Sequence, residues 1–285
     1  MTLPFTWLDV FTGRALTGNQ LAVVHDADGL DEATMLAFAR ETRMSETTFV
    51  QSASEPRATY RNRIFDPRGE LPLAGHPTLG TAVAVAMRRG ERSASYVQQT
   101  PAGLQPVDVE LTDGGAAQAS MLQEPAEFGP EVGAGDVLAA AGLSPGDLHL
   151  QLPPQAVSTG YRHLLAVVGD GATLDRCAPR LELLEPLLEW LDCGVLSLAA
   201  VDCAAGRAQV RAFFPAFVAV HEDPATGSAA GALCSYLDQR CGLATVEIEQ
   251  GVAMGRPSRL LAAIEGDRVR VSGEVVVLAT GELRL

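Results

Sequence analysis

The feature of this sequence that most restricts its fold is an internal repeat. The run Leu21–Val24 returns as Leu165–Val168 with the same four residues, and in both places a helix-like segment and then an apolar strand follow. The turn His76–Ala82 returns as Asp223–Ala229, an offset of 147 positions (223 minus 76). Chance matches between short Ala- and Gly-rich stretches are the alternative explanation. Because the shared features keep the same order and a nearly constant offset, we predict two similar halves.

The repeat also predicts how the chain is divided. The stretch Pro125–Gly135 is rich in Gly, Pro and Glu, which is typical of a junction. We therefore expect a first half over residues 1–125 and a second half over residues 126–274, with residues 275–285 returning as a strand to complete the first half. Each half mixes strand-like and helix-like segments, so the expected fold class is α+β.

Local patterns predict the elements of the first half. Asp31 precedes an apolar stripe of helical period and is suited to cap a helix that ends near Arg43. β-branched and aromatic residues at Thr47–Val50 and the run Tyr60–Phe65 indicate strands. A helix of small residues is expected at Pro77–Met87, and its counterpart in the second half follows Ser228.

The charge of the chain excludes some classes of partner. There are 35 acidic and 21 basic residues, a net charge of −14, and no basic cluster suited to a phosphate backbone or an anionic membrane surface. We therefore expect no nucleic-acid and no membrane partner. All the basic residues are arginine, so the chain offers no lysine for a Schiff base with a carbonyl substrate or with pyridoxal phosphate.

Cysteine and histidine spacing indicates neither a disulfide framework nor a metal site. The five cysteines are odd in number and form no CxxC pair, and the five histidines are scattered. The N-terminal residues lack a basic segment followed by an apolar one, and no apolar run approaches eighteen residues. These observations predict a cytoplasmic protein without a bound metal.

Candidate site residues come from the turns that lead into the small-residue helices. There, free backbone N–H groups at a helix start can receive a carboxylate. If the halves pack about a pseudo-two-fold axis, His76 and Asp223 occupy equivalent positions and face one cleft. Glu46, beside an apolar strand, is a third candidate for proton transfer, and Ser228 is a fourth. Taken singly, each could instead be a cap, a turn residue or a solvated acid.

These motifs resemble one known family, the PhzF-like isomerases of the phenazine-biosynthesis type, which are related in fold to diaminopimelate epimerase. The resemblance covers essentially the whole chain. It rests on four ordered motifs: Asp9–Thr12 with Gly18-Asn19, Ser45–Val50, Glu70–Pro72 running into Gly75–Thr78, and Glu222–Ala229.

The resemblance implies a fold in which each half wraps a mixed, barrel-like sheet around one central helix, with the active site between the halves. It implies that Glu46 is the general acid/base and that His76, Asp223 and Ser228 orient the substrate and assist proton movement. Further substrate-binding positions are expected at Asn19, Ser45, Gly75 and Gly227.

The resemblance also implies a reaction: a cofactor-independent, proton-transfer isomerisation of a small carboxylate, of the kind that a cyclic hydroxy-amino acid such as a dihydro-hydroxyanthranilate undergoes. A homodimer is the family-based expectation. The racemases of this superfamily use two opposed cysteines, whereas the first half of this chain contains none. Two alternatives stay open: a non-catalytic binding protein of the same fold, and a related lyase or hydratase.

Overall fold

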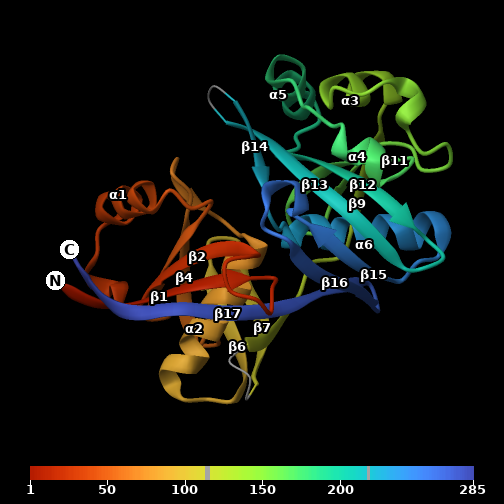
Figure 1. Ribbon diagram of the computed structural model, residues 1–285. Helices are drawn as coiled ribbons and strands as arrows, with labels where there is room; N and C mark the ends of the chain where they lie inside the picture. Colours follow the sequence, from red (N-terminus) through yellow and green to blue (C-terminus); the bar gives the residue numbers. More distant parts are fainter. Residues whose placement is uncertain (113–115, 217–218) are drawn as a thin grey trace. The chain divides into compact units, whose positions relative to one another are not determined.

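The computed structural model describes residues 1–112, 116–216 and 219–285. Contacts between Cα atoms divide the chain into two compact units, Met1–Leu122 together with Ser272–Leu285, and Gln123–Val271 (Figure 1). The repeat in the sequence places the corresponding bounds at residues 125 and 275.

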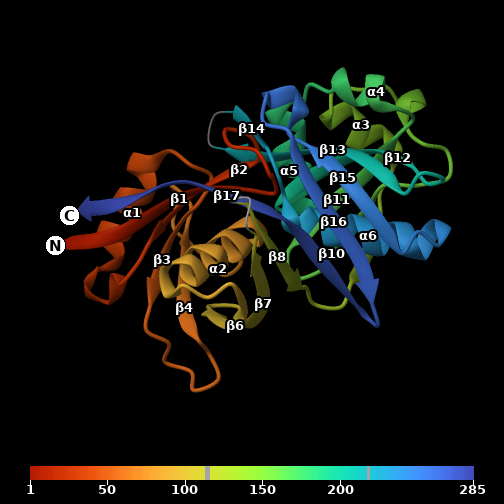
Figure 2. The ribbon, with the colours of Figure 1, turned by 60° about the horizontal axis from the view of Figure 1, so that its bottom comes forward.

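The first unit is a closed ring of strands around one helix. Hydrogen-bonded pairs run in the order β1-β2-β3-β4-β6-β7-β8-β17, and β17 pairs back with β1. Helix α2 lies inside this ring, in contact with β1 to β4 and β6 to β8 (Figure 2). The elements are β1 (Thr2–Val10), β2 (Asn19–Val24), α1 (Glu32–Thr42), β3 (Thr47–Gln51), β4 (Tyr60–Phe65), β5 (Glu70–Leu71), α2 (Gly75–Arg89), β6 (Ser93–Thr100), β7 (Gly103–Leu111), β8 (Ala116–Leu122) and β17 (Arg268–Arg284), with a 3-10 turn at Ala27–Gly29.

Small side chains allow α2 to occupy the centre of the ring. A Cβ atom on Gly80 would lie 2.5 Å from Leu21 Cδ2, closer than real atoms approach, so the strands contact the helix backbone directly. The helix begins at Gly75 and ends at Arg89, two residues beyond the predicted Pro77–Met87 at each end. Pro77 stands in the first turn, where no N–H is needed, so it does not mark the helix start.

Helix α1 covers a second apolar layer on the outside of the ring. As predicted, Asp31 caps it: the Asp31 side chain accepts a hydrogen bond of 2.8 Å from the backbone N–H of Thr34. Met35 packs in a cluster with Phe49 and Phe65, whose rings meet edge to face with centroids 5.6 Å apart.

The second unit surrounds α6 in a similar way. Helix α6 contacts β10, β11, β15 and β16, while α3 and α5 pack together in an outer apolar cluster. The elements are β9 (Glu127–Glu131), α3 (Ala134–Ala140), β10 (Gln155–Ser158), β11 (Arg162–Val168), α4 (Gly171–Asp175), α5 (Leu181–Trp190), β12 (Val195–Asp202), β13 (Arg207–Ala216), β14 (Ala219–Asp223), α6 (Gly227–Cys241), β15 (Thr245–Gln250) and β16 (Ser258–Glu265), with 3-10 turns at Pro145–Asp147 and Val252–Met254.

Strand pairing follows the same order in both units. In the first unit the antiparallel pairs are β1–β2, β3–β4, β4–β5 and β6–β7, and the parallel pairs are β2–β3 and β4–β6. In the second unit the corresponding antiparallel pairs are β10–β11, β12–β13, β13–β14 and β15–β16, and the corresponding parallel pairs are β11–β12 and β13–β15. Each unit places its central helix after the short strand β5 or β14, so the two halves share one topology.

The structure corrects one part of the repeat, the predicted equivalence of His76 and Asp223. On the β4–β5 and β13–β14 hairpins, Phe65 pairs with Glu70 and Phe213 pairs with Glu222. The offset is therefore 148 before the turn (213 minus 65) and 152 after it (222 minus 70), because the second hairpin is four residues longer. Since the helices start at residues 75 and 227, again 152 apart, the counterpart of His76 is Ser228. A constant offset of 147 could not reveal this change in loop length.

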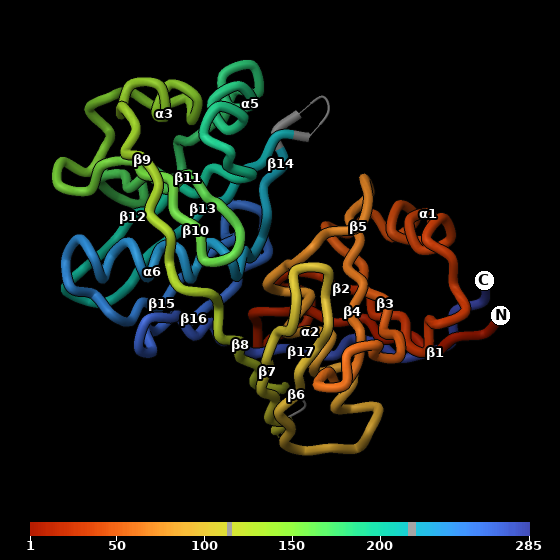
Figure 3. The backbone as a smooth tube through the Cα atoms, turned by 180° about the vertical axis from the view of Figure 1, so that it is seen from behind, coloured from red at the N-terminus to blue at the C-terminus, as the bar shows by residue number. Residues whose placement is uncertain are grey.

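Strand β17 connects the two units and brings the chain ends together. It starts at Arg268 in the second unit, and from Ser272 onwards it belongs to the first. Its last residues pair with β1, Arg284 opposite Thr2, so the N- and C-termini lie side by side (Figure 3). Within the part of the chain that the structure describes, no helix is both long and apolar enough to cross a bilayer.

Candidate active site

Four of the predicted site residues meet in the first unit, where β2, the segment before β3 and the start of α2 come together. The Ser45 hydroxyl donates to Asn19 Oδ1 at 3.2 Å. Asn19 Nδ2 lies 3.1 Å from Nδ1 of His76, the second residue of α2, and His76 Nε2 lies 3.4 Å from Glu46 Oε2. A continuous polar chain thus runs from Ser45 through Asn19 and His76 to Glu46.

Burial determines the protonation state of His76. Its side chain is 5% exposed, and this burial lowers its pKa to about 3, although a contact with the backbone of Gln20 acts in the opposite direction. The imidazole is therefore neutral at ordinary pH and carries one ring proton. Asn19 Nδ2 and the backbone of Gln20 both contact the buried ring, and His76 Nε2 is the ring atom that faces Glu46 Oε2.

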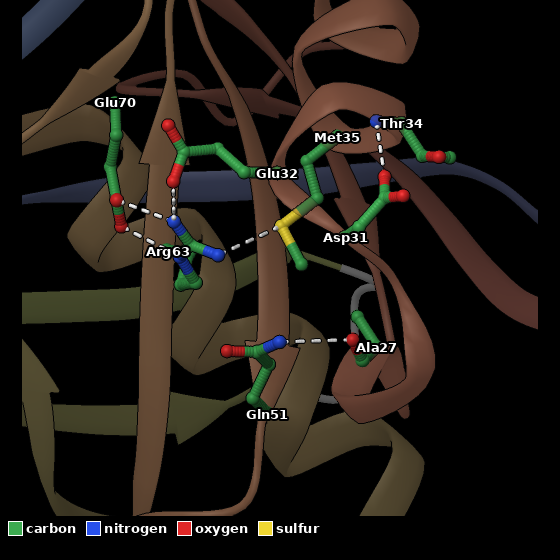
Figure 4. Close-up of polar contacts among 8 residues, drawn as sticks. All are labelled: Ala27, Asp31, Glu32, Thr34, Met35, Gln51, Arg63 and Glu70. Carbon is green, nitrogen blue, oxygen red and sulfur yellow. Dashed lines mark hydrogen bonds and ion pairs between the residues drawn. The ribbon is translucent and has the colours of Figure 1, made fainter.

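An ion pair secures the strand that leads into α2. Figure 4 shows Arg63 of β4 between two acids, with its Nε and Nη2 donating to Glu70 Oε1 at 2.8 Å and Oε2 at 2.6 Å, and Nη2 also 3.2 Å from Glu32 Oε2. The Arg63 guanidinium also lies over the Phe65 ring, 5.2 Å from its centroid. Glu70 lies five residues before Gly75, the first residue of α2. This bidentate ion pair therefore holds in place the segment that precedes His76.

The second unit repeats that contact on β13 and β14. Arg211 Nε and Nη2 donate to Glu222 Oε1 at 2.9 Å and Oε2 at 2.8 Å, and the guanidinium lies 4.9 Å from the centroid of Phe213. Glu222 lies five residues before Gly227, the first residue of α6. A bidentate Arg–Glu ion pair therefore precedes each of the two central helices.

Around the start of α6 the polar cluster contains an imidazole and two hydroxyls. His163 of β11 lies with Nε2 3.0 Å from Ser228 Oγ and with Nδ1 3.3 Å from Ser197 Oγ on β12. The His163 ring is fully buried, which lowers its pKa to about 3, so it too is neutral. Ser228 takes the helix position that His76 takes in α2, and His163 supports it from the strand that corresponds to β2.

Asp223 lies at the end of β14, beside this cluster. Its Oδ2 accepts a hydrogen bond of 2.5 Å from the Thr226 hydroxyl, and its backbone carbonyl accepts from Gln250 Nε2 at 2.8 Å. Thr226, and not Asp223, stands at the N-cap position of α6. The Gly227 carbonyl accepts from Gln123 Nε2 at 2.9 Å. These contacts hold a carboxylate and the first turn of α6 in fixed positions.

The predicted residues therefore form two groups. Asn19, Ser45, Glu46 and His76 are joined by contacts in the first unit, and Gly75 is the residue before His76. In the second unit Asp223, Gly227 and Ser228 lie within six residues, at the start of α6.

Sequence reasoning missed His163, although the repeat contained a signal for it. His163 stands two residues before Leu165–Val168, as Asn19 stands two residues before Leu21–Val24. A polar residue at that place in both halves could have been recognised as the partner of the helix start. Among the described residues, no three His, Cys, Asp or Glu side chains gather as they would around a metal ion.

The fold and the two polar clusters define the class of protein. A hydroxyproline epimerase from Agrobacterium vitis has the same fold, with a TM-score of 0.67 at 12% identity over 99% of this chain and 91% of that one. A predicted epimerase from Pseudomonas aeruginosa matches with a TM-score of 0.87 at 36% identity over 99% of both chains. The chain therefore has the α+β, diaminopimelate epimerase-like fold, with helix starts that present polar side chains.

The family follows from the sequence comparison. The family model described as phenazine biosynthesis-like protein matches residues 8–281. A trans-2,3-dihydro-3-hydroxyanthranilate isomerase from Pseudomonas aeruginosa is 35% identical over 98% of this chain and 98% of its own length. The chain belongs to the phenazine biosynthesis-like family, and it is an isomerase.

Proposed function

We propose that this isomerase moves a proton between two positions of a small carboxylate substrate, without a cofactor, with Glu46 as acid and base. The observation that carries the proposal is the contact between half-buried Glu46 and buried His76, with Glu46 Oε2 3.4 Å from His76 Nε2. Carbon acids release protons slowly, so a base held in place next to a polar, water-poor surface is what such a reaction needs.

In this mechanism the Glu46 carboxylate takes a proton from one carbon of the substrate and returns it to another. Neutral His76 lies beside the carboxylate, with its Nε2 3.4 Å from Glu46 Oε2, and the contact between Asn19 Nδ2 and His76 Nδ1 holds the ring in place. His76 stays neutral through the reaction because its burial opposes a positive charge. The chain has no lysine, so a Schiff-base route is closed to it.

The polar groups at the start of α6 are proposed to bind substrate as well. Ser228 offers a hydroxyl held by His163, and Asp223 offers a carboxylate that suits an amino or hydroxyl group. A substrate with an amine and a hydroxyl beside its carboxylate would offer groups that suit these side chains. The relative from Pseudomonas aeruginosa is named for such a compound, which supports the proposed class, a cyclic hydroxy-amino acid.

Hydrogen exchange with solvent tests the role of Glu46 directly. The protein is incubated in deuterated water with a panel of cyclic and amino-acid-like carboxylates that includes trans-2,3-dihydro-3-hydroxyanthranilate, and deuterium at carbon is measured by mass spectrometry. We expect incorporation with the wild type and a loss of about 10²- to 10⁴-fold with Glu46→Gln. Glu41→Gln, which changes an exposed carboxylate on α1, is the matched control and should keep the wild-type rate.

Other outcomes would contradict the proposal. Panel members that bind but show no incorporation would indicate a binding protein of the same fold. A product that has lost or gained water would indicate a lyase or hydratase. Deuterium incorporation by Glu46→Gln at the wild-type rate would show that a residue other than Glu46 transfers the proton.

A further inference from the structure

We propose that Cys203 and Cys241 form a reversible disulfide, so that this pair is an oxidation site for peroxides or for small disulfides such as oxidised glutathione. The two residues are 38 positions apart in the sequence, yet their sulfur atoms lie 3.4 Å apart on the surface of the second unit. That separation is a contact between two thiols, and a covalent bond would shorten it further.

Both segments are held in place before any bond forms. Cys203 follows β12 in a tight turn, in which Asp202 Oδ1 accepts hydrogen bonds from the backbone N–H groups of Ala204 at 3.1 Å and Ala205 at 3.0 Å. Cys241 is the last residue of α6, and its thiol donates to the Leu237 carbonyl at 3.2 Å. Because turn and helix end are already fixed, closing the bond costs little chain entropy.

Exposure separates this pair from the other cysteines. Cys203 and Cys241 are exposed, whereas Cys177, Cys193 and Cys234 are buried. Burial raises the pKa of Cys177 to about 12, of Cys193 to about 11 and of Cys234 to about 12, so these thiols are shielded both from reagents and from ionisation.

The reaction with hydrogen peroxide is a balanced two-electron oxidation. The thiolate of one cysteine attacks a peroxide oxygen, which breaks the O–O bond, and a sulfenic acid and water result. The second thiol then attacks that sulfur, the S–S bond forms and the hydroxyl leaves as a second water molecule. Partial burial and the Cys241 thiol raise the pKa of Cys203, so the rate should increase with pH over the neutral to alkaline range.

The disulfide would tie together the part of the second unit that carries its polar cluster. The loop between the two cysteines contains β13, β14 and all of α6, and with them Asp223, Gly227 and Ser228. Cross-linking such a loop restricts the unfolded chain, so the oxidised second unit should melt roughly 5–10 °C higher than the reduced one. The sulfur atoms are already in contact, so the bond should form without rearrangement of α6.

Peptide mapping tests the proposal independently of the enzymatic activity. The native protein is treated with hydrogen peroxide or with oxidised glutathione, remaining thiols are alkylated, and the digest is analysed by mass spectrometry with and without reductant. We expect one cross-linked peptide that joins Cys203 to Cys241, lighter by two hydrogen atoms than its halves, which disappears on reduction. Cys193→Ala should keep this peptide, and Cys203→Ser should abolish it.

Three results would overturn the inference. Both exposed cysteines could remain alkylatable after the oxidant is consumed, or they could carry separate glutathione or sulfinic groups without a cross-link. Alternatively, the cross-link could join different chains or a buried cysteine. A protein that melts at the same temperature before and after a verified cross-link would refute the proposed effect on the second unit. Cys241→Ser provides a second variant if Cys203→Ser folds poorly.

Discussion

The contact between Arg63 and Glu70 should contribute far more to stability than an exposed ion pair of similar length. The side chains of Arg63 and Glu70 are 11% and 20% exposed and share two hydrogen bonds. Arg88 and Asp26 approach to 2.5 Å, but they are 43% and 61% exposed and share one contact. If the N···O distance alone set the strength of an ion pair, the exposed pair would be the stronger one. Burial and the two shared hydrogen bonds make the pair of Arg63 and Glu70 the stronger one.

The expected magnitudes follow from these exposures. Hydrogen bonds to charged groups contribute about 1.5–3 kcal/mol when screened from water, and exposed pairs contribute about 0.2–1 kcal/mol. We therefore expect a coupling energy of about 2 kcal/mol for Arg63 and Glu70 and below about 1 kcal/mol for Arg88 and Asp26. Removing one partner alone should cost more than the coupling, because the other charge stays partly buried.

Double-mutant cycles measure both couplings. Arg63→Met keeps the aliphatic stem, Glu70→Gln keeps the shape, and urea unfolding gives the free energies of the single and double variants. Arg88→Met and Asp26→Asn form the matched control cycle. High salt should remove the coupling of the exposed pair and leave most of the other. The reasoning is refuted if Arg63 and Glu70 couple by less than about 0.5 kcal/mol, or no more strongly than the control pair.

Two further predictions concern pH and packing. The unfolded chain binds a proton on His163 below about pH 6.5, whereas the folded chain does so only below about pH 3, so stability should fall as the pH falls through this window. His163→Asn should flatten that fall by about 1.4 kcal/mol per pH unit between pH 6 and 4 in urea unfolding, and an unchanged slope would contradict the buried neutral ring. Gly80→Ala should destabilise by about 1–3 kcal/mol, because the new Cβ would meet Leu21 Cδ2 at 2.5 Å. Gly135→Ala, in helix α3 with no heavy atom within 4 Å of the new Cβ, should stabilise by about 0.5–1 kcal/mol, and equal melting shifts for the two variants would refute the packing argument.

Much of the local structure could be predicted from the sequence, because it depends on neighbouring residues. The cap at Asp31, the strand at Tyr60–Phe65 and the two helices of small residues were all marked by short patterns. The proline pattern predicts a start of α2 at Pro77, two residues after the actual start at Gly75, because the first turn of a helix tolerates proline at several positions.

By itself the sequence determined that the chain has two similar α+β halves, that a Schiff-base lysine is absent, and that Glu46, His76, Asp223 and Ser228 are the candidate site residues. These conclusions depend on residue types and on their order. Only the tertiary structure decided that Ser228, and not Asp223, corresponds to His76, that His163 supports Ser228, and that Cys203 touches Cys241. The first depends on strand register and on the length of a hairpin. The other two depend on how a helix packs against strands and turns that are far from it in the sequence.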